Sequence, residues 1–264
     1  MAGPGFARAT ASVFGRALRL AVIAAIGSGM VYGASLFGRK VAVLAVVALL
    51  IALGTVLIWL PRAAHRAFQR GLFGRASALY RVLGWVRFRR QTRAAVRVSL
   101  AACALGANRY ERALALLDRY QPGDFPDALR AAWLNNRAYA LVRAERDGRE
   151  ALRQSESAIS LRPDVPGFRH TRGIALMHLG RLDEAIRELD GLWSAISGDE
   201  RGHLLEAERC YDLGLAWRAK GEHEYAADYF QRARRASPES PWALRAADYL
   251  DDRHGLEQLR AQIE

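Results

Sequence analysis

The sequence predicts an all-α protein, in which an N-terminal two-helix transmembrane hairpin precedes an α-solenoid of about four helix pairs and a C-terminal capping helix pair. Three observations lead to this prediction. Two long uncharged runs stand near the N-terminus, a two-helix pattern recurs at intervals near 34 residues from about Ala94 onward, and the excess positive charge accompanies the apolar runs. With 51% hydrophobic residues, the chain has enough apolar side chains to bury a core.

The charge is divided sharply along the chain. Sixteen of the 39 Lys and Arg residues lie between Met1 and Arg109, where no Asp or Glu occurs, and the first acidic residue is Glu111. From there onward 23 basic residues meet all 27 acidic ones, a net charge of −4. Basic residues commonly flank membrane helices, so we attribute the overall charge of +12 to membrane topology, and nucleic acid is the less favoured partner.

The two apolar runs have the length of membrane spans. Residues 20–38 form 19 consecutive uncharged positions and residues 41–61 form 21. At about 1.5 Å per residue each gives roughly 28 to 32 Å of helix, which matches a hydrocarbon core of about 30 Å. Trp59 is expected at the membrane interface and Pro61 at the helix stop. Because glycine and serine weaken the first run, a signal peptide stays an alternative there, and the Arg-bearing, acid-free first nineteen residues leave an organelle transit peptide as another.

Small residues recur at every fourth position of the first run, at Ala21, Ala25, Gly29 and Gly33. Such a stripe lets another helix backbone approach closely. It predicts packing against the second helix of the hairpin, with homo-oligomerisation through Gly29 and Gly33 as the alternative.

The distribution of basic residues predicts the orientation of the hairpin. Three arginines precede the first span, the turn carries Arg39 and Lys40, and ten arginines lie between Arg62 and Arg97. The positive-inside rule therefore places both termini and the solenoid on the cytoplasmic side of the inner membrane, with an organelle membrane as the alternative.

Residues 62–93 form a basic juxtamembrane segment that is expected to be helical, with breaks at Gly71, Gly74 or Gly84. Arginines alternate there with aromatic residues, a mixture that suits the headgroup region of a bilayer. The alternative is an extra helix pair that caps the solenoid, with solvated arginines. The candidate membrane-interface residues are Arg66, Arg70, Trp85, Arg87, Arg89 and Arg90.

The repeat is clearest in residues 207–240, where large, small, aromatic and turn residues alternate in a fixed order. These residues are Leu213, Gly214, Trp217, Gly221, Ala226, Phe230, Ala233 and Pro238. Three earlier copies share the alanine that follows the turn, at Ala113, Ala151 and Ala185. Small residues let two helices cross closely, and stacking of units supplies the core that one unit cannot bury. Residues 241–264 follow as the capping pair.

On these residues, positions 94–240 resemble the tetratricopeptide repeat (TPR) family, in a membrane-anchored bacterial form. The resemblance implies a right-handed superhelix whose concave face, built from the first helix of each pair, binds a peptide or helix of a protein partner. By register, the partner-binding groove would contain Asn135, Tyr139, His170, Ile174, Met177, Tyr211, Leu215 and Arg218. Val98 and Ala102 stand where some TPR proteins carry a carboxylate clamp, so a partner with an acidic C-terminal tail is not supported.

Nothing in the sequence has the spacing of a catalytic or metal site. No Gly-rich phosphate loop, HExxH motif or Ser-His-Asp set occurs, and Cys103 and Cys210 are expected to be buried free thiols. We therefore expect a scaffold without enzymatic activity, metal or cofactor. The alternatives are an accessory subunit of a membrane or cell-envelope enzyme complex, and a protein that binds lipid or nucleic acid through its arginine-rich segment.

Overall fold

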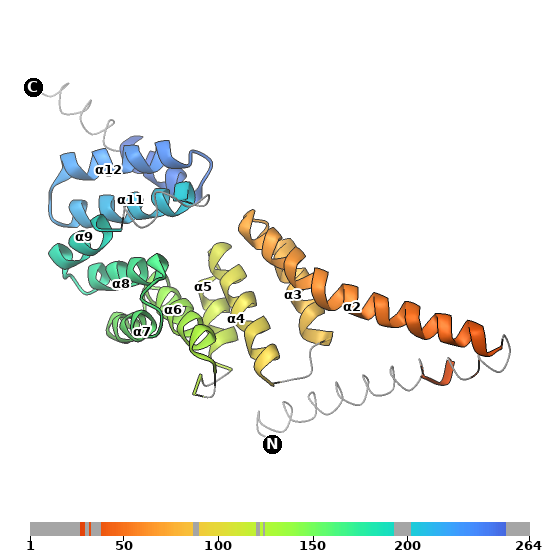
Figure 1. Ribbon diagram of the computed structural model, residues 1–264. Helices are drawn as coiled ribbons and strands as arrows, with labels where there is room; N and C mark the ends of the chain where they lie inside the picture. Colours follow the sequence, from red (N-terminus) through yellow and green to blue (C-terminus); the bar gives the residue numbers. More distant parts are fainter. Residues whose placement is uncertain are drawn as a thin grey trace, which may run out of the picture. The chain divides into compact units, whose positions relative to one another are not determined.

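The computed structural model describes residues 27–29, 32, 38–86, 90–119, 122–123, 125–192 and 202–251 (Figure 1). The chain divides into two compact units, Met1–Arg62 and Ala63–Glu264. All regular secondary structure in the described residues is helical, as the sequence predicted.

The N-terminal unit contains most of α2 (Arg39–Gln69). Among the described residues, one helical stretch, Val43–Gln69, is long and apolar enough to cross a membrane, and its apolar window is entirely unburied. Leu44, Leu50 and Ile51 are examples of the exposed large side chains. Most of the first predicted span, residues 20–38, lies outside the described residues, so the two-helix hairpin stays a prediction.

Pro61 does not end this helix, and the sequence-based prediction of a stop there was wrong. α2 continues through Pro61 to Gln69. Proline removes one backbone donor, and in this turn the Arg62 Nη1 atom donates to the carbonyl oxygen of Ile58 at 3.2 Å. Beyond the proline, Ala64 and Ala67 are buried, so packing holds the last turns in helical form.

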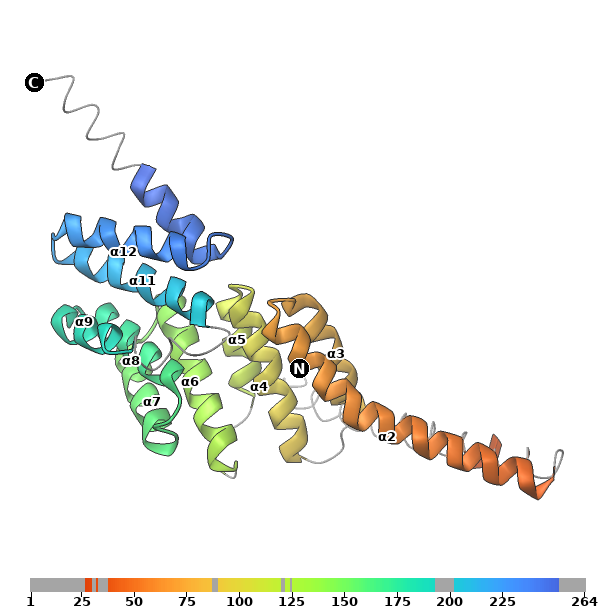
Figure 2. The same ribbon diagram turned by 45° about the horizontal axis from the view of Figure 1, so that its top comes forward.

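The chain reverses at residues 70–72 and returns as α3 (Phe73–Val86). Gly71 has a φ of +72°, and the Leu72 amide donates to the Ala67 carbonyl at 2.9 Å, as in a left-handed helix cap. Figures 1 and 2 both show α3 beside the end of α2. Of the three glycines expected to break this segment, only Gly71 does so, because Gly74 and Gly84 lie within α3.

In the described part of the chain four helix pairs follow, and a further helical stretch at residues 241–251 packs on the last of them. The pairs are α4 (Arg90–Gly106) with α5 (Tyr110–Leu117), α6 (Asp127–Arg143) with α7 (Gly148–Leu161), α8 (Pro166–His178) with α9 (Leu182–Asp190), and α11 (Gly202–Ala219) with α12 (His223–Ala236). Four helix pairs were predicted. The second predicted capping helix, residues 255–263, lies outside the described residues.

Small residues allow the helices of a pair to cross closely. A Cβ added to Gly173 of α8 would lie 2.7 Å from the Leu189 side chain of α9, and one added to Gly214 of α11 would lie 2.7 Å from the Phe230 ring of α12. These are the contacts that the repeat pattern requires, because a larger residue would push the two helices apart.

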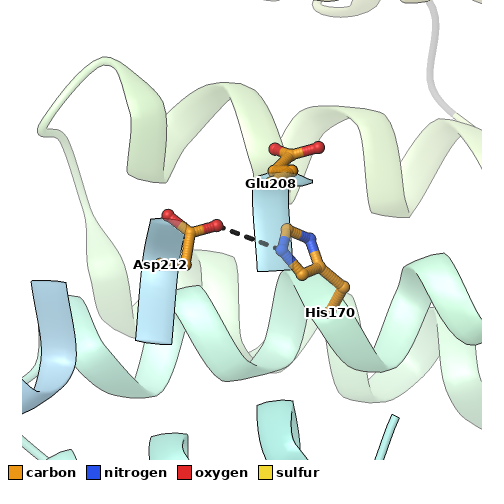
Figure 3. A group of neighbouring side chains, drawn as sticks. All are labelled: His170, Glu208 and Asp212. Carbon is orange, nitrogen blue, oxygen red and sulfur yellow. Dashed lines mark ion pairs between the residues drawn. The ribbon is translucent and has the colours of Figure 1, made fainter. Parts of the chain in front are cut away.

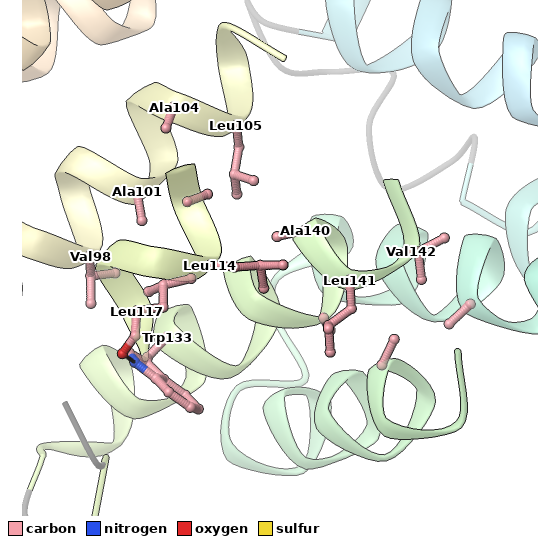
Figure 4. Close-up of a cluster of buried hydrophobic side chains, with 14 of the residues drawn as sticks. Val98, Ala101, Ala104, Leu105, Leu114, Leu117, Trp133, Ala140, Leu141 and Val142 are labelled. Atoms are coloured by element: carbon pink, nitrogen blue, oxygen red, sulfur yellow. Dashed lines mark hydrogen bonds between the residues drawn. The ribbon is translucent and has the colours of Figure 1, made fainter. Parts of the chain in front are cut away.

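The core runs between the pairs without interruption from α4 to α8 (Figure 4). Leu114 and Leu117 of α5 and Trp133 and Leu141 of α6 lie within it, and the Trp133 Nε1 donates to the Leu117 carbonyl oxygen at 3.1 Å. Cys103 and Cys210 are both buried free thiols, as predicted. The repeated helix pairs, their glycine crossings and this shared core make the fold TPR-like.

Candidate partner-binding groove

The predicted groove residues belong to α6, α8 and α11, the first helices of the last three pairs. On α11, Glu208, Tyr211, Asp212 and Leu215 follow the spacing i, i+3, i+4, i+7, so their side chains share one face of the helix. Two of these four are acidic, and they meet charged and aromatic side chains of α6 and α8.

Arg143 at the end of α6 connects that helix to α11 by a fork of hydrogen bonds. Its Nη1 donates to Asp212 Oδ1 at 2.9 Å, and its Nη2 donates to Asp212 Oδ2 at 2.7 Å and to Glu208 Oε1 at 2.8 Å. The Asp212 side chain is fully buried, and those of Arg143 and Glu208 are about 10% exposed. Bidentate, charge-assisted pairs of this kind are the strongest hydrogen bonds of a protein interior.

Tyr139 and His170 add two further polar groups to these contacts. We call the set of Tyr139, Arg143, His170, Glu208 and Asp212 the ion cluster. The Tyr139 hydroxyl donates to Glu208 Oε1 at 2.5 Å. His170 Nε2 of α8 lies 3.0 Å from Asp212 Oδ2, and Figure 3 shows the imidazole turned toward Asp212, with Glu208 beside it. The cluster therefore joins α6, α8 and α11.

Aromatic rings cover the guanidinium of Arg143. Its Cζ lies 5.1 Å from the centroid of the Tyr139 ring and 4.5 Å from that of Trp242, a buried residue of the stretch 241–251. Tyr211 packs against Trp242 with ring centroids 5.6 Å apart. A cation held against desolvated rings is attracted to their faces, so the stretch 241–251 also contacts α6 through Arg143.

The contacts within the cluster shift the pKa values of Asp212, Arg143 and Tyr139. Burial alone would raise the pKa of Asp212, but Arg143 and His170 outweigh it and hold that pKa below its usual value of 3.8. Burial would lower the pKa of Arg143, but Asp212, Tyr139 and Glu208 raise it well above its usual value. Burial is also the main reason why the pKa of Tyr139 lies well above 10.0. Asp212 and Arg143 therefore stay charged at neutral pH.

His170, Glu208 and Asp212 offer ligand atoms within 4.8 Å of one another, a spacing that a metal ion could use. However, Arg143 already binds both oxygens of Asp212 and one of Glu208. A divalent cation bound by these carboxylates would be repelled by the guanidinium of Arg143, which already contacts them. The geometry thus fits an internal ion pair rather than a metal site.

The eight predicted groove residues differ in what they expose. Tyr139 and His170 belong to the ion cluster, and Ile174 is fully buried in the core. Tyr211 and Leu215 are partly buried against the core of the last pair, while Asn135 and Met177 are half-buried. Arg218 is exposed, with its Cζ 5.0 Å above the Tyr249 ring.

Sequence reasoning missed Arg143, Glu208 and Asp212. Glu208 and Asp212 share a face of α11 with the predicted Tyr211 and Leu215, and Arg143 follows Tyr139 by four residues on α6, so helical spacing alone places them beside the groove. Of the predicted membrane-interface residues, Arg66 and Arg70 are exposed and Trp85 is 49% exposed. Arg87, Arg89 and the side chain of Arg90 lie outside the described part of the chain.

The helix pairs and the inward face of their first helices define the class of the protein, a TPR-like helical-repeat protein. Residues 64–260 match the family described as "T7SS, ESX-1 secretion system protein EccA1, N-terminal domain", and the chain belongs to this family. The match begins directly after the apolar part of α2 and includes every helix pair.

Solved structures with similar folds are distant in sequence. YrrB, described as a TPR protein with an unusual peptide-binding site, is 20% identical, with 73% of this chain and 92% of that chain covered and a TM-score of 0.42. MamA from AMB-1 is 18% identical, with 69% and 100% covered and a TM-score of 0.44. A Podospora anserina kinesin-light-chain-like protein with TPR-like repeats is 19% identical, with 68% and 93% covered and a TM-score of 0.47. No curated protein matches the chain.

Proposed function

We propose that this chain is a membrane-anchored, non-catalytic scaffold whose TPR-like solenoid binds a protein partner at the cytoplasmic face of the inner membrane, as part of a type VII secretion system. The family match carries this proposal, since its description names a component of the ESX-1 secretion system. The series of paired helices supports a binding role, because stacked repeats present an extended concave surface to a partner.

The membrane anchor is supported by the unburied apolar window of α2. Leu50 is 61% exposed near the middle of the apolar stretch, and an arginine at the centre of a span costs about 3 kcal/mol on insertion scales. The full chain should stay with membranes after alkaline carbonate extraction, and Leu50→Arg should release a large fraction of it. Tyr225→Arg, at an exposed aromatic residue of α12, is the matched control and should leave the distribution unchanged. Release of the unaltered chain would overturn the anchor.

The proposed cytoplasmic orientation is supported by the ten arginines that come after the apolar part of α2. A protease-cleavable tag placed after Glu264 should be protected in intact cells and cut after the membrane is opened. Cleavage in intact cells would place the solenoid on the other side.

Partner binding is best tested at groove residues that do not belong to the ion cluster. A photo-crosslinking amino acid in place of Met177, in the full chain in its own cells, should capture a protein partner, and Arg218→Glu should reduce the yield. The same crosslinker in place of Arg149, an exposed residue of α7, is the control. Equal products from both positions, or none from Met177, would refute the groove assignment.

A further inference from the structure

Helix α3 has two faces of different character. Ala76, Tyr80 and Leu83 are buried on one face, and at Gly84 an added Cβ would lie 3.1 Å from Val96 of α4, so this face packs on the solenoid. The opposite face is exposed although it carries large apolar side chains, since Val82 is 51% and Trp85 is 49% exposed.

Arginine accompanies these apolar residues on the exposed face. Arg75, Ala78, Val82 and Trp85 follow one another at intervals of three or four residues, and Arg81 lies beside them, with its Nε donating to the Ser77 carbonyl at 3.3 Å. No acidic residue precedes Glu111 in the sequence, so this helix carries positive charge only. Exposed tryptophan and valine between arginines suit the boundary between water and anionic lipid, where rings sit among headgroups and guanidinium groups bind phosphate.

The exposed face lies close in sequence to the apolar stretch of α2. Only residues 70–72 separate the stretch Val43–Gln69 from the start of α3 at Phe73, so α3 directly follows the proposed anchor along the chain.

We propose that the exposed face of α3 lies on the bilayer surface and binds anionic phospholipid headgroups through Arg75 and Arg81, with Val82 and Trp85 inserted among them. This inference rests on the membrane anchor proposed above. It gives the solenoid a second attachment, which restricts its rotation about the end of α2. A positively charged surface with unburied apolar residues is complementary to an acidic bilayer, whereas a zwitterionic bilayer offers no net charge to the arginines.

The experiment uses the full chain reconstituted into vesicles, with an environment-sensitive fluorophore attached through Val82→Cys. The two native cysteines are buried and should not compete for the label. We expect blue-shifted, enhanced emission in vesicles that contain phosphatidylglycerol, water-like emission in pure phosphatidylcholine, and reversal by high salt. Leu244→Cys, 59% exposed on the stretch 241–251, is the matched control and should report water in both lipids.

The variant Arg75→Glu with Arg81→Glu should abolish the blue shift. Each arginine near an anionic surface changes the equilibrium about fivefold, so loss of two lowers the ratio of bound to free α3 about 30-fold or more. Far-UV circular dichroism checks that the variant is folded, and Arg75→Gln with Arg81→Gln provides a milder second variant that should give an intermediate shift.

Vesicle flotation after carbonate treatment separates the two proposals. If the chain floats but the label at position 82 reports water in anionic vesicles, the proposal for α3 is wrong and the membrane anchor stands. If the chain does not float, the membrane anchor is wrong, and the proposal for α3 is wrong with it. Equal blue shifts in both lipids would refute selection of anionic headgroups. A shift that depends on protein density, or on added RNA, would assign the face to a second copy or to nucleic acid and overturn the proposal.

Discussion

Replacing Arg143 by leucine removes the cation that holds α6 to α11. The change leaves the carboxylate of Asp212, which is fully buried, and that of Glu208, which is 13% exposed, without three charge-assisted hydrogen bonds. Removal of one partner from a buried ion pair costs about 3 to 5 kcal/mol, mostly because the remaining charge stays desolvated. For a unit of this size we expect the Tm to fall by roughly 6 to 20 °C, since each kcal/mol corresponds to about 2 to 4 °C.

Thermal unfolding of the full chain in detergent, followed by far-UV circular dichroism, measures this effect. Arg146→Leu is the matched control, because Arg146 makes the same bidentate contact to Glu111 only three residues further on. Its side chain is 57% exposed and that of Glu111 is 63% exposed, so the control should cost less than about 1 kcal/mol.

The double variant Arg143→Leu with Asp212→Leu tests the physical reason for the loss. If desolvated charge is the cause, removing both partners should restore at least about 2 kcal/mol relative to the sum of the single variants. Additive losses, or equal losses for Arg143→Leu and the Arg146 control, would show that the cluster does not hold the helices together.

Three further outcomes follow from the geometry. Gly214→Ala should destabilise the chain by about 1 to 3 kcal/mol in thermal melts, because the new methyl group meets a buried ring, whereas Gly167→Ala, with open space around its Cα, should be neutral or slightly stabilising. The pKa of Asp212 is lower in the folded chain than in the unfolded chain, so its contribution to stability is complete above about pH 4. That contribution is lost as the pH falls through the pKa of Asp212 in the folded chain. The Tm should therefore drop over this acidic range, and it should drop less in the Arg143→Leu variant. Burial raises the pKa of the Cys210 thiol, and both cysteines are buried, so Ellman's reagent should react with neither until the chain is denatured.

The helix pairs were predictable because their signal is local. Gly173 and Gly214 stand at the same position of successive repeats, and the structure shows that each accommodates a large residue of the following helix. Helical spacing and steric size therefore determine this part of the fold with no knowledge of longer-range contacts.

The helix end at Pro61 was predicted wrongly because a local rule was applied where packing decides. Pro61 lacks one backbone donor, yet α2 continues through it and buries Ala64 and Ala67 in the following turns. The ion cluster was missed for a related reason. Arg143 and Asp212 are 69 residues apart, and helical spacing gives the face on which each lies but not the helix that it will meet.

The ion cluster also limits how the proposed protein partner could bind to the predicted groove. An acidic group of a partner could approach Arg143 only by displacing Asp212 and Glu208, and this would leave two carboxylates desolvated and unpaired. A basic group would compete with Arg143 for the same oxygens and gain little, because the existing contact is bidentate and covered by Trp242. Specific attraction is therefore expected beside the cluster, where Met177 and Arg218 offer apolar and cationic surface, and the cluster itself contributes by holding α6, α8 and α11 in a fixed arrangement before a partner arrives.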